Sequence, residues 1–395
     1  AADVAYPVRG MFHRQRNVTF RRGTVTGVDW GRRELQVGST DAGVGRVAFH
    51  HLVVAAGAVA TWFGVDGAVE HSFPLYTLDD SVALRNHVVE RFEAADANPA
   101  LVDRGALTFV IVGGGPTGVE TAGALAELFA VVFRRDYPHL DITRARVILV
   151  ETQDVLLGNF AKPSQRHAAK SLGTRGVELR LGQSVDLIAA DHVRLATGET
   201  IPTETVIWAA GVRAHPLAAA LGVPTGRQGR IEVGPDLAVA GHENVWAIGD
   251  IAAIPGKRGA TLPQLAPVAM QSGDHVAEQI RRLLDGKGTQ RFSFFDRGTM
   301  ATIGRRSAVA ELPGGIKLGG TPAWLAWLGL HLLYLAGTRN RASVLLNWFW
   351  SYLTWDRGPR LILGADVAGG TAGVDDATGE VASLACAKDA PASRE

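Results

Sequence analysis

The sequence is poor in cysteine. Among its 395 residues there is one, Cys386. A single cysteine excludes a disulfide within the chain, a redox-active Cys-x-x-Cys pair and a zinc site made of thiolates. Cys386 lies in an alanine-rich tail, so we expect it to be an idle thiol.

The chain also lacks an excess of charge of either sign. Lys and Arg number 40, and Asp and Glu number 39, which gives a formal net charge of +1 with His neutral. This balance leaves no basic footprint for nucleic acid, so no nucleic-acid partner is expected. Residues 1–4 form neither a basic nor an apolar segment. Nothing there indicates secretion, and we expect a cytosol-facing protein.

Several catalytic signatures are missing as well. The sequence has no G-x-S-x-G nucleophile elbow and no P-loop lysine. Their absence disfavours hydrolases and nucleoside triphosphatases. The 12 histidines include one adjacent pair, His50 and His51, so no metal site is predicted.

What is present is a large apolar fraction with many turns. Hydrophobic residues make up 47% of the chain, and 47 residues are glycine. Residues 17–37 alternate as short strands joined by turns do, which predicts a small antiparallel meander. Residues 51–58 form an apolar run ending in glycine, typical of a buried parallel strand. The apolar spacing of residues 78–93 predicts a helix.

A strand, a glycine-rich turn, a helix and a second strand follow. Residues 107–112 are almost entirely apolar and run directly into a turn at 113–118. Residues 119–132 are rich in Ala, Leu and Glu, and residues 147–151 form another apolar run that closes with an acid. This order predicts a βαβ unit. Later strands are expected at 177–181, 205–210 and 245–248, and the alternation indicates a doubly wound α/β fold.

The turn matches the dinucleotide fingerprint G-x-G-x-x-G. Gly113 permits the tight turn, Gly115 lets a pyrophosphate approach the backbone, and Gly118 lets helix and strand pack closely. Glu151 follows at the end of the next strand, farther on than the usual distance, and residues 134–139 look like an insertion that explains the extra length. A carboxylate there favours NADH over NADPH. The alternative is a glycine-rich turn without a ligand.

Two acidic residues admit two interpretations each. Glu120 lies two residues past Gly118, in the first turn of the predicted helix, where it is either a simple capping carboxylate or a functional acid. Asp250 ends the predicted strand at 245–248 and either meets a polar group of a cofactor or is a turn residue.

Five of the nine tryptophans fall between Trp324 and Trp355, in two apolar blocks at 323–337 and 343–355. Each block is shorter than the roughly 20 residues that cross a bilayer. Helices in the membrane interface, a core or dimer interface, and a span all remain open, with arginines flanking both blocks. His331 is expected to be an interface or core residue. From residue 367 onward we expect a disordered tail.

Read in order, these motifs resemble the type II NADH:quinone oxidoreductases. The likeness runs over residues 15–365 and rests on GGGPTGVE (113–120), WAAGV (208–212), AIGD (247–250), APVAMQSG (266–273), RGTMATIG (297–304) and the Trp-rich C-terminus. The resemblance implies a single-subunit flavoprotein that takes hydride from NADH, reduces a membrane quinone through FAD and pumps no proton. It also implies an α/β fold with two Rossmann-like dinucleotide-binding domains and C-terminal amphipathic helices. These helices would hold a peripheral, often dimeric respiratory enzyme on the cytoplasmic face of the bacterial inner membrane, against an anionic lipid surface.

Carried over residue by residue, the resemblance implies roles for eleven positions. Those assigned to NADH are Gly113, Gly114, Gly115, Gly118, Glu151 and Gly211. Those assigned to FAD are Gly249, Asp250 and Ala269. Glu120 would stand where nicotinamide and flavin meet, and Gln271 would contact the quinone. A first glutamine of the family is replaced here by Pro267, which offers no side-chain donor.

The resemblance also suggests a division of the chain. We expect a partial FAD-binding domain at 1–103, an NADH-binding domain at 104–228, a return segment of the FAD-binding domain at 229–290, a membrane-association region at 291–365 and a tail at 366–395. No strand, Gly-rich turn and helix for the FAD pyrophosphate precedes Ala1. The FAD domain is therefore expected to be incomplete at its N-terminus, in a fragment or a chain read from a downstream start.

Two other functions fit part of this pattern. One is a flavin-free, membrane-attached NADH-binding module, acting as a sensor or an inactive remnant. The other is an NADH-dependent flavoprotein reductase with a protein acceptor, which the Trp-rich C-terminus disfavours. Disulfide reductases of similar architecture are excluded by the single cysteine.

Overall fold

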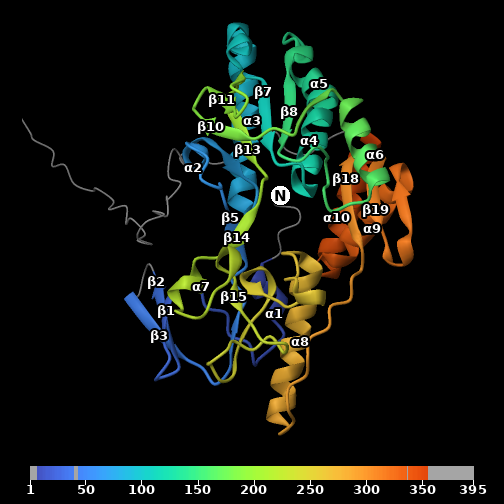
Figure 1. Ribbon diagram of the computed structural model, residues 1–395. Helices are drawn as coiled ribbons and strands as arrows, with labels where there is room; N and C mark the ends of the chain where they lie inside the picture. The colour runs from blue at the N-terminus through green and yellow to red at the C-terminus, as the bar shows by residue number, and fades with distance from the viewer. Residues whose placement is uncertain (1–6, 40–42, 336, 355–395) are drawn as a thin grey trace, which may run out of the picture.

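The computed structural model of the chain describes residues 7–39, 43–335 and 337–354. A parallel five-stranded sheet organises the upper body in Figure 1. Its strands lie in the order β6 (Phe73–Pro74), β13 (Thr205–Trp208), β7 (Thr108–Val112), β8 (Arg146–Glu151) and β9 (Val177–Leu181). Every neighbouring pair is parallel, with Val110 opposite Ile148 and Val206. All five residues of β7 are buried, as expected for the centre of a parallel sheet covered on both faces.

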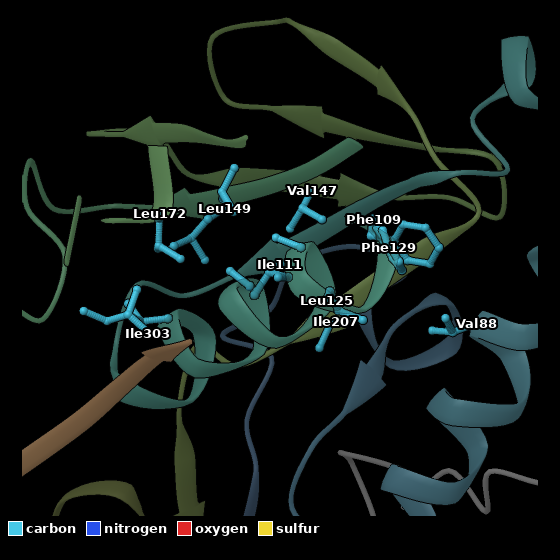
Figure 2. Close-up of a cluster of buried hydrophobic side chains, with 14 of the residues drawn as sticks. Val88, Phe109, Ile111, Leu125, Phe129, Val147, Leu149, Leu172, Ile207 and Ile303 are labelled. Carbon is cyan, nitrogen blue, oxygen red and sulfur yellow. The ribbon is translucent and has the colours of Figure 1, made fainter. Parts of the chain in front are cut away.

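Alternate residues of the sheet face two different layers. One set packs under α3 (Leu78–Ala97), α4 (Pro116–Glu127) and α6 (Lys162–Gly173). Figure 2 shows Phe109, Ile111 and Leu149 of this set beside Leu125 of α4. The other set packs against a small antiparallel sheet of β10 (Val185–Ile188), β11 (His192–Leu195) and β12 (Thr200–Pro202), with α2 (Ala68–His71). The predicted α/β class is confirmed, but an antiparallel sheet takes the place of helices on this face.

The last turns of the long helix after β7 widen. α4 continues as the π-helix η2 (Leu128–Phe133) and the short α5 (Arg134–Asp136) before the 3₁₀ turn η3 (Ile142–Arg144). Three rings, Phe92, Phe129 and Phe133, pack here with centroids 4.3 to 5.9 Å apart. The residues after η2 include the stretch 134–139, and its interpretation as an insertion that lengthens the path from Gly118 to Glu151 stays a prediction.

The lower body in Figure 1 is built around two short parallel pairs. β4 (Leu52–Val54) pairs with β16 (Val245–Ala247), and β15 (Ile231–Glu232) pairs with β17 (Ala252–Ala253). The helix α8 (Ala266–Leu284) and the short α7 (Leu217–Ala220) pack against them, and α1 (Val8–Phe12) lies nearby. An antiparallel sheet of β1 (Thr24–Asp29), β2 (Glu34–Ser39) and β3 (Gly43–Ala48) projects from one side.

Two antiparallel strands join the bodies. β5 (Ala58–Ala60) pairs with β14 (Val212–Ala214), and the Trp208 indole donates to the carbonyl of Thr61 at 2.7 Å. These segments are far apart in the chain and meet between the two bodies (Figure 1). The chain therefore crosses from one body to the other and back.

A C-terminal unit completes the described chain. The hairpin of β18 (Thr299–Gly304) and β19 (Ser307–Glu311), with β20 (Lys317–Gly319), packs on α4 and α6. Ile303 joins the core of the upper body, where Figure 2 shows it near Leu172. α9 (Gly320–Tyr334) and α10 (Thr338–Thr354) follow.

Most elements expected from the sequence are present. The meander expected at 17–37 begins only at Thr24 and gains a third strand, β3. The strand expected at 51–58 is split into β4 and β5, and the helix expected at 78–93 runs to Ala97 behind a capping box of Thr77 and Asp80. The expected tail and Cys386 lie outside the described residues.

Candidate functional site

The glycine turn begins where β7 ends. Gly113 has φ +112°, and a Cβ on it would lie 2.5 Å from the carbonyl oxygen of Ala209. A Cβ on Gly118 would lie 1.8 Å from the carbonyl oxygen of Gly113. Around Gly115, by contrast, a Cβ would meet nothing within 4 Å. Packing within the protein therefore demands glycine at Gly113 and Gly118, whereas Gly115 leaves open space in front of the first turn of α4.

The carboxylate of Glu151 is hydrogen-bonded to this turn. Oε2 accepts from the backbone N–H of Gly114 at 2.5 Å, and Oε1 accepts from the N–H of Gln153 at 2.8 Å and the hydroxyl of Thr152 at 3.0 Å. A carboxylate has about four acceptor sites, so these three donors leave capacity for a further hydroxyl. A ribose hydroxyl is a donor of that kind.

Gly211 lies at the join between the two bodies. Its carbonyl accepts from the N–H of Thr61 at 3.2 Å, and a Cβ on Gly211 would lie 3.0 Å from the ring of Phe63. Phe63 is 63% exposed and has φ +52°, rare for a bulky residue. Nothing in the sequence around Phe63 indicated this conformation.

A second group of predicted residues meets at the carboxyl ends of β4 and β16. A cavity of about 320 Å³ lies there, lined by Ala55, Gly57, Ile248, Gly249, Asp250, Ala266 and Ala269. Gly249 has φ +67°, its N–H donates to the hydroxyl of Ser272 at 3.1 Å, and a Cβ on it would lie 3.3 Å from the Cβ of Ala269. Gly249, Asp250 and Ala269, predicted together, therefore line one cavity.

The carboxylate of Asp250 accepts a hydrogen bond from Tyr76, a residue that the sequence did not single out. Burial raises the pKa of Asp250, while the buried Arg230 guanidinium and a hydrogen bond from the Tyr76 hydroxyl partly oppose the rise. The same hydroxyl accepts from the N–H of Ala58 at 3.1 Å and lies 3.5 Å from a Cβ built on Gly57. Tyr76 thus ties the two strand ends of the cavity together.

Glu120 lies in the second turn of α4, because the helix begins at Pro116. Its Oε1 accepts from the backbone N–H of Thr302 at 3.0 Å, and the Trp327 indole donates to the same carboxylate. Burial raises the pKa of Glu120, and the two hydrogen bonds oppose the rise. The interpretation as a first-turn capping carboxylate is wrong, since the carboxylate is held by the C-terminal unit.

Gln271 is held by the backbone of Phe295. Its Nε2 donates to the Phe295 carbonyl at 2.9 Å, and its Oε1 accepts from the Phe295 N–H at 3.0 Å. Pro267 lies in the first turn of α8, where its missing N–H would have no helical partner. A contact between Gln271 and a quinone stays a prediction, and it would require the amide to exchange these bonds.

A larger hollow lies away from all of these residues. It has a volume of about 530 Å³ between η2 and the segment 137–145, and Phe129, Tyr137 and Arg175 are among its lining residues. It sits near Val147 and Gly176, at the amino ends of the strands. Ligands of open α/β sheets bind at the carboxyl ends, so we do not assign the site here.

The helices α9 and α10 expose a run of large apolar side chains. These are Leu325, Leu333, Tyr334, Leu345, Leu346, Phe349 and Trp350. Within the described residues, one segment, Pro116–Asp136, is long and apolar enough to cross a membrane, with a mean hydropathy of 1.2. That segment begins within the glycine turn and is half buried in the core, which identifies it as a core helix.

Comparison with known proteins identifies the family. The profile of the family described as pyridine nucleotide-disulphide oxidoreductase matches residues 4–273, and the NDH2 C-terminal domain matches residues 297–355. The type II NADH:quinone oxidoreductase Ndh of Mycobacterium tuberculosis is 35% identical over 368 residues, covering 90% of this chain and 78% of that protein. The type II NADH:quinone oxidoreductase of Staphylococcus aureus is 31% identical over 320 residues, covering 79% and 76%.

A solved structure has the same fold. NDH2 from Plasmodium falciparum in complex with NADH superposes with a TM-score of 0.79 at 15% identity, covering 87% of this chain and 85% of that one. The fold and the sequence similarity agree. The chain belongs to the type II NADH:quinone oxidoreductases, within the pyridine nucleotide-disulphide oxidoreductase family.

Proposed function

We propose that this chain oxidises NADH and reduces a quinone drawn from a bilayer, with FAD as its resident cofactor and without pumping protons. When bound, the flavin supplies the chemistry: it takes hydride from nicotinamide and returns two electrons to the quinone. The chain's own residues bind and orient these partners. The observation that carries the proposal is the open glycine turn with Glu151 fastened beside it.

The turn is suited to the NADH pyrophosphate. The open space at Gly115 lets phosphate oxygens approach the backbone, and the unpaired N–H groups of the first turn of α4 favour negative charge. Glu151 has an acceptor position left for an adenosine ribose hydroxyl. The same carboxylate would repel the 2′-phosphate of NADPH, so NADH is the preferred nucleotide.

The cavity at Asp250 fits one end of a flavin nucleotide. The carboxylate of Asp250 is an acceptor for polyol hydroxyls, and the small residues Gly57, Gly249 and Ala269 keep the space open. Gly249 and Asp250 would hold the ribityl and phosphate region, and Ala269 would lie beside the isoalloxazine. This cavity also disfavours the flavin-free alternative, because an NADH-binding module has no use for it.

Glu120 and Gln271 are proposed as the two catalytic side chains. The raised pKa of Glu120 suits a group that orients a substrate and holds or releases a proton. Gln271 would hydrogen-bond a quinone carbonyl after leaving Phe295.

The enzymes of this class are peripheral membrane proteins, and we place the docking surface on α9 and α10. Their exposed apolar side chains would enter the interface, and Arg339 and Arg341 of α10 would meet anionic headgroups. We further propose that the protein sits on the cytoplasmic face and forms a homodimer. Flotation with vesicles of anionic and of neutral lipid tests the lipid preference, and sedimentation tests the dimer.

The proposal is tested by mixing the purified chain with FAD, NADH and a short-chain quinone. We expect sustained loss of NADH absorbance only when the chain, FAD and the quinone are all present. Bound flavin should give visible absorption bands. Asp250→Ala should release the flavin and stop quinone reduction, while NADH still quenches protein fluorescence. Absence of both flavin binding and NADH oxidation in the unmodified chain would contradict the proposal.

Replacing Tyr76 by phenylalanine is expected to weaken flavin binding by about tenfold to at most about 100-fold. The change removes the hydroxyl that donates to Asp250 and accepts from Ala58, and a lost hydrogen bond to a charged group costs about 1.5–3 kcal/mol at most. The pKa of Asp250 should rise further, so the loss grows as pH falls. Flavin titration at two pH values measures the effect. Tyr334→Phe, on α9, is the matched control and should bind flavin as the wild type does.

A further inference from the structure

The turn that follows β5 holds a phenylalanine in an unfavourable conformation. Phe63 has φ +52° and Gly64 has φ +75°, and the N–H of Val65 donates to the carbonyl of Trp62 at 3.0 Å. Two central residues with positive φ inside this hydrogen bond characterise a type I′ turn, in which asparagine followed by glycine is preferred. A phenylalanine at the first central position destabilises the turn, because its Cβ crowds the following carbonyl oxygen.

The turn is nevertheless firmly held. The indole of Trp62 donates to the hydroxyl of Ser72 at 3.2 Å, and the side chains of Trp62 and Val65 pack against the core of the upper body. Phe63 lies between these two packed residues, yet it is 63% exposed. The packed neighbours therefore fix the backbone of the turn, and they leave the ring of Phe63 facing outward.

One edge of this ring lies against the backbone of Gly211. A Cβ built on Gly211 would lie 3.0 Å from Cζ and 3.2 Å from Cε2 of Phe63. The N–H of Thr61, two residues before Phe63, donates to the carbonyl of Gly211 at 3.2 Å. Since Gly211 has no side chain, the ring can lie close to its backbone, and a larger residue at this position would displace the ring.

Phe63 stands on the side of the sheet where the nicotinamide half of NADH would lie. β8 flanks β7 on one side and β13 flanks it on the other. Glu151 ends β8, so a nucleotide with its adenosine ribose there and its pyrophosphate on the turn after β7 continues towards the carboxyl end of β13. A Cβ on Gly113 would lie 2.5 Å from the carbonyl oxygen of Ala209, just past the end of β13. Gly211 follows two residues later, with the Phe63 ring against it.

The same stretch of chain reaches the cavity at Asp250. Gly57 lines that cavity, and β5 follows it directly. β5 pairs with β14, and Figure 1 shows the two strands between the two bodies. A nicotinamide that meets a flavin must lie in this region, beside the turn that contains Phe63.

We propose that Phe63 is a binding residue for the nicotinamide half of NADH, whose apolar surface packs against the exposed ring. The inference rests on the proposed function, in which NADH occupies the glycine turn, and it adds a contact at the opposite end of the nucleotide. An aromatic ring kept in water gains from being covered by a ligand. Residues held in sparsely populated backbone conformations cluster at such sites.

The first test compares affinity and stability in Phe63→Asn. Asparagine before Gly64 is the pair that this turn prefers, so the melting temperature should rise by about 1–3 °C. The affinity for NADH should fall roughly 5- to 10-fold, as expected for the loss of one aromatic contact. Calorimetric titration of the full chain and thermal unfolding measure the two effects. Unchanged affinity, or affinity lost together with stability, overturns the proposal.

Gln228→Asn is the matched control. Gln228 and Gly229 also both have positive φ, and the N–H of Arg230 donates to the carbonyl of Arg227 at 3.4 Å, in the lower body. This substitution should raise the melting temperature in the same way and leave NADH binding unchanged. Phe63→Tyr keeps the ring and should bind NADH as the unmodified chain does. An equal loss of affinity in Gln228→Asn, or in Phe63→Tyr, contradicts the proposal.

A second ligand locates the contact along the nucleotide. ADP-ribose carries the adenosine and the pyrophosphate but no nicotinamide. Phe63→Asn should bind ADP-ribose as tightly as the unmodified chain does, whereas Gly115→Ala should lose affinity for both ligands. An equal loss of both ligands in Phe63→Asn overturns the inference and leaves the proposed function standing. If the unmodified chain binds neither NADH nor ADP-ribose, the proposed function is rejected, and the inference falls with it.

Discussion

Replacing Gly115 by alanine is expected to lower the affinity for NADH by about 100-fold, close to 2.7 kcal/mol, while leaving the melting temperature unchanged. The backbone of Gly115, with φ −71° and ψ −176°, suits alanine, and an added Cβ meets nothing in the protein within 4 Å. The methyl group instead fills the space through which the pyrophosphate approaches the backbone. Calorimetric titration with NADH, beside thermal unfolding, measures both effects.

Two other glycines serve as comparisons for Gly115. Gly173, at the end of α6, also has free space around an added Cβ, so Gly173→Ala should bind NADH as the wild type does. Gly118→Ala should unfold the domain, because its Cβ would lie 1.8 Å from the carbonyl oxygen of Gly113. Undiminished NADH binding by Gly115→Ala would show that the nucleotide docks elsewhere.

Replacing Gly123 by alanine is expected to destabilise the protein by about 3 kcal/mol or more and to detach the C-terminal hairpin from α4. An added Cβ would lie 1.8 Å from the carbonyl oxygen of Ile303 and 2.7 Å from its carbon. These are backbone atoms, so no side chain can move aside. The bond from Thr302 to Glu120 would be lost with the displaced strand.

The effect of Gly123→Ala can be followed by thermal unfolding and by limited proteolysis of the segment after residue 304. Quinone reduction should fall much more than NADH binding. The glycine turn lies at the N-terminus of α4, whereas the clash lies in the second half of the helix. Gly173→Ala is again the control, since it adds the same methyl group to a helix without a clash. A variant as stable as the wild type would mean that α4 and β18 are less closely packed than described.

The unit from β7 to β8 could be predicted from the sequence because its signals are local. An apolar run, a glycine turn and a helix of Ala, Leu and Glu each depend on neighbouring residues, and the positive φ of Gly113 follows from the turn itself. The short strands were harder to predict from the sequence. β5 and β14 pair from far apart in the chain, with Ala60 opposite Val212 and Ala58 opposite Ala214, and neither strand has enough residues to show an alternating pattern.

The candidate site was predicted in part. The juxtaposition of Gly249, Asp250 and Ala269 in one cavity was expected, whereas Tyr76 and Phe63 were not, because their positions depend on chain segments that are distant in sequence. Glu120 was interpreted from its position in the helix and from the family resemblance, and neither indicated which groups hold its carboxylate. Its partners, Thr302 and Trp327, lie beyond the reach of any local pattern.

By itself, the sequence determined the family, the glycine turn after β7 and the acidic residue at the end of β8, since backbone conformation and apolar periodicity depend on consecutive residues. The tertiary structure alone decided which glycines face open space, as at Gly115, and which are packed against the backbone of another element, as at Gly123. It also decided that the Glu120 carboxylate on α4 accepts a hydrogen bond from the N–H of Thr302 on β18. Contacts of this kind arise only when elements pack, because burial and close approach depend on neighbours that the chain brings together from far away.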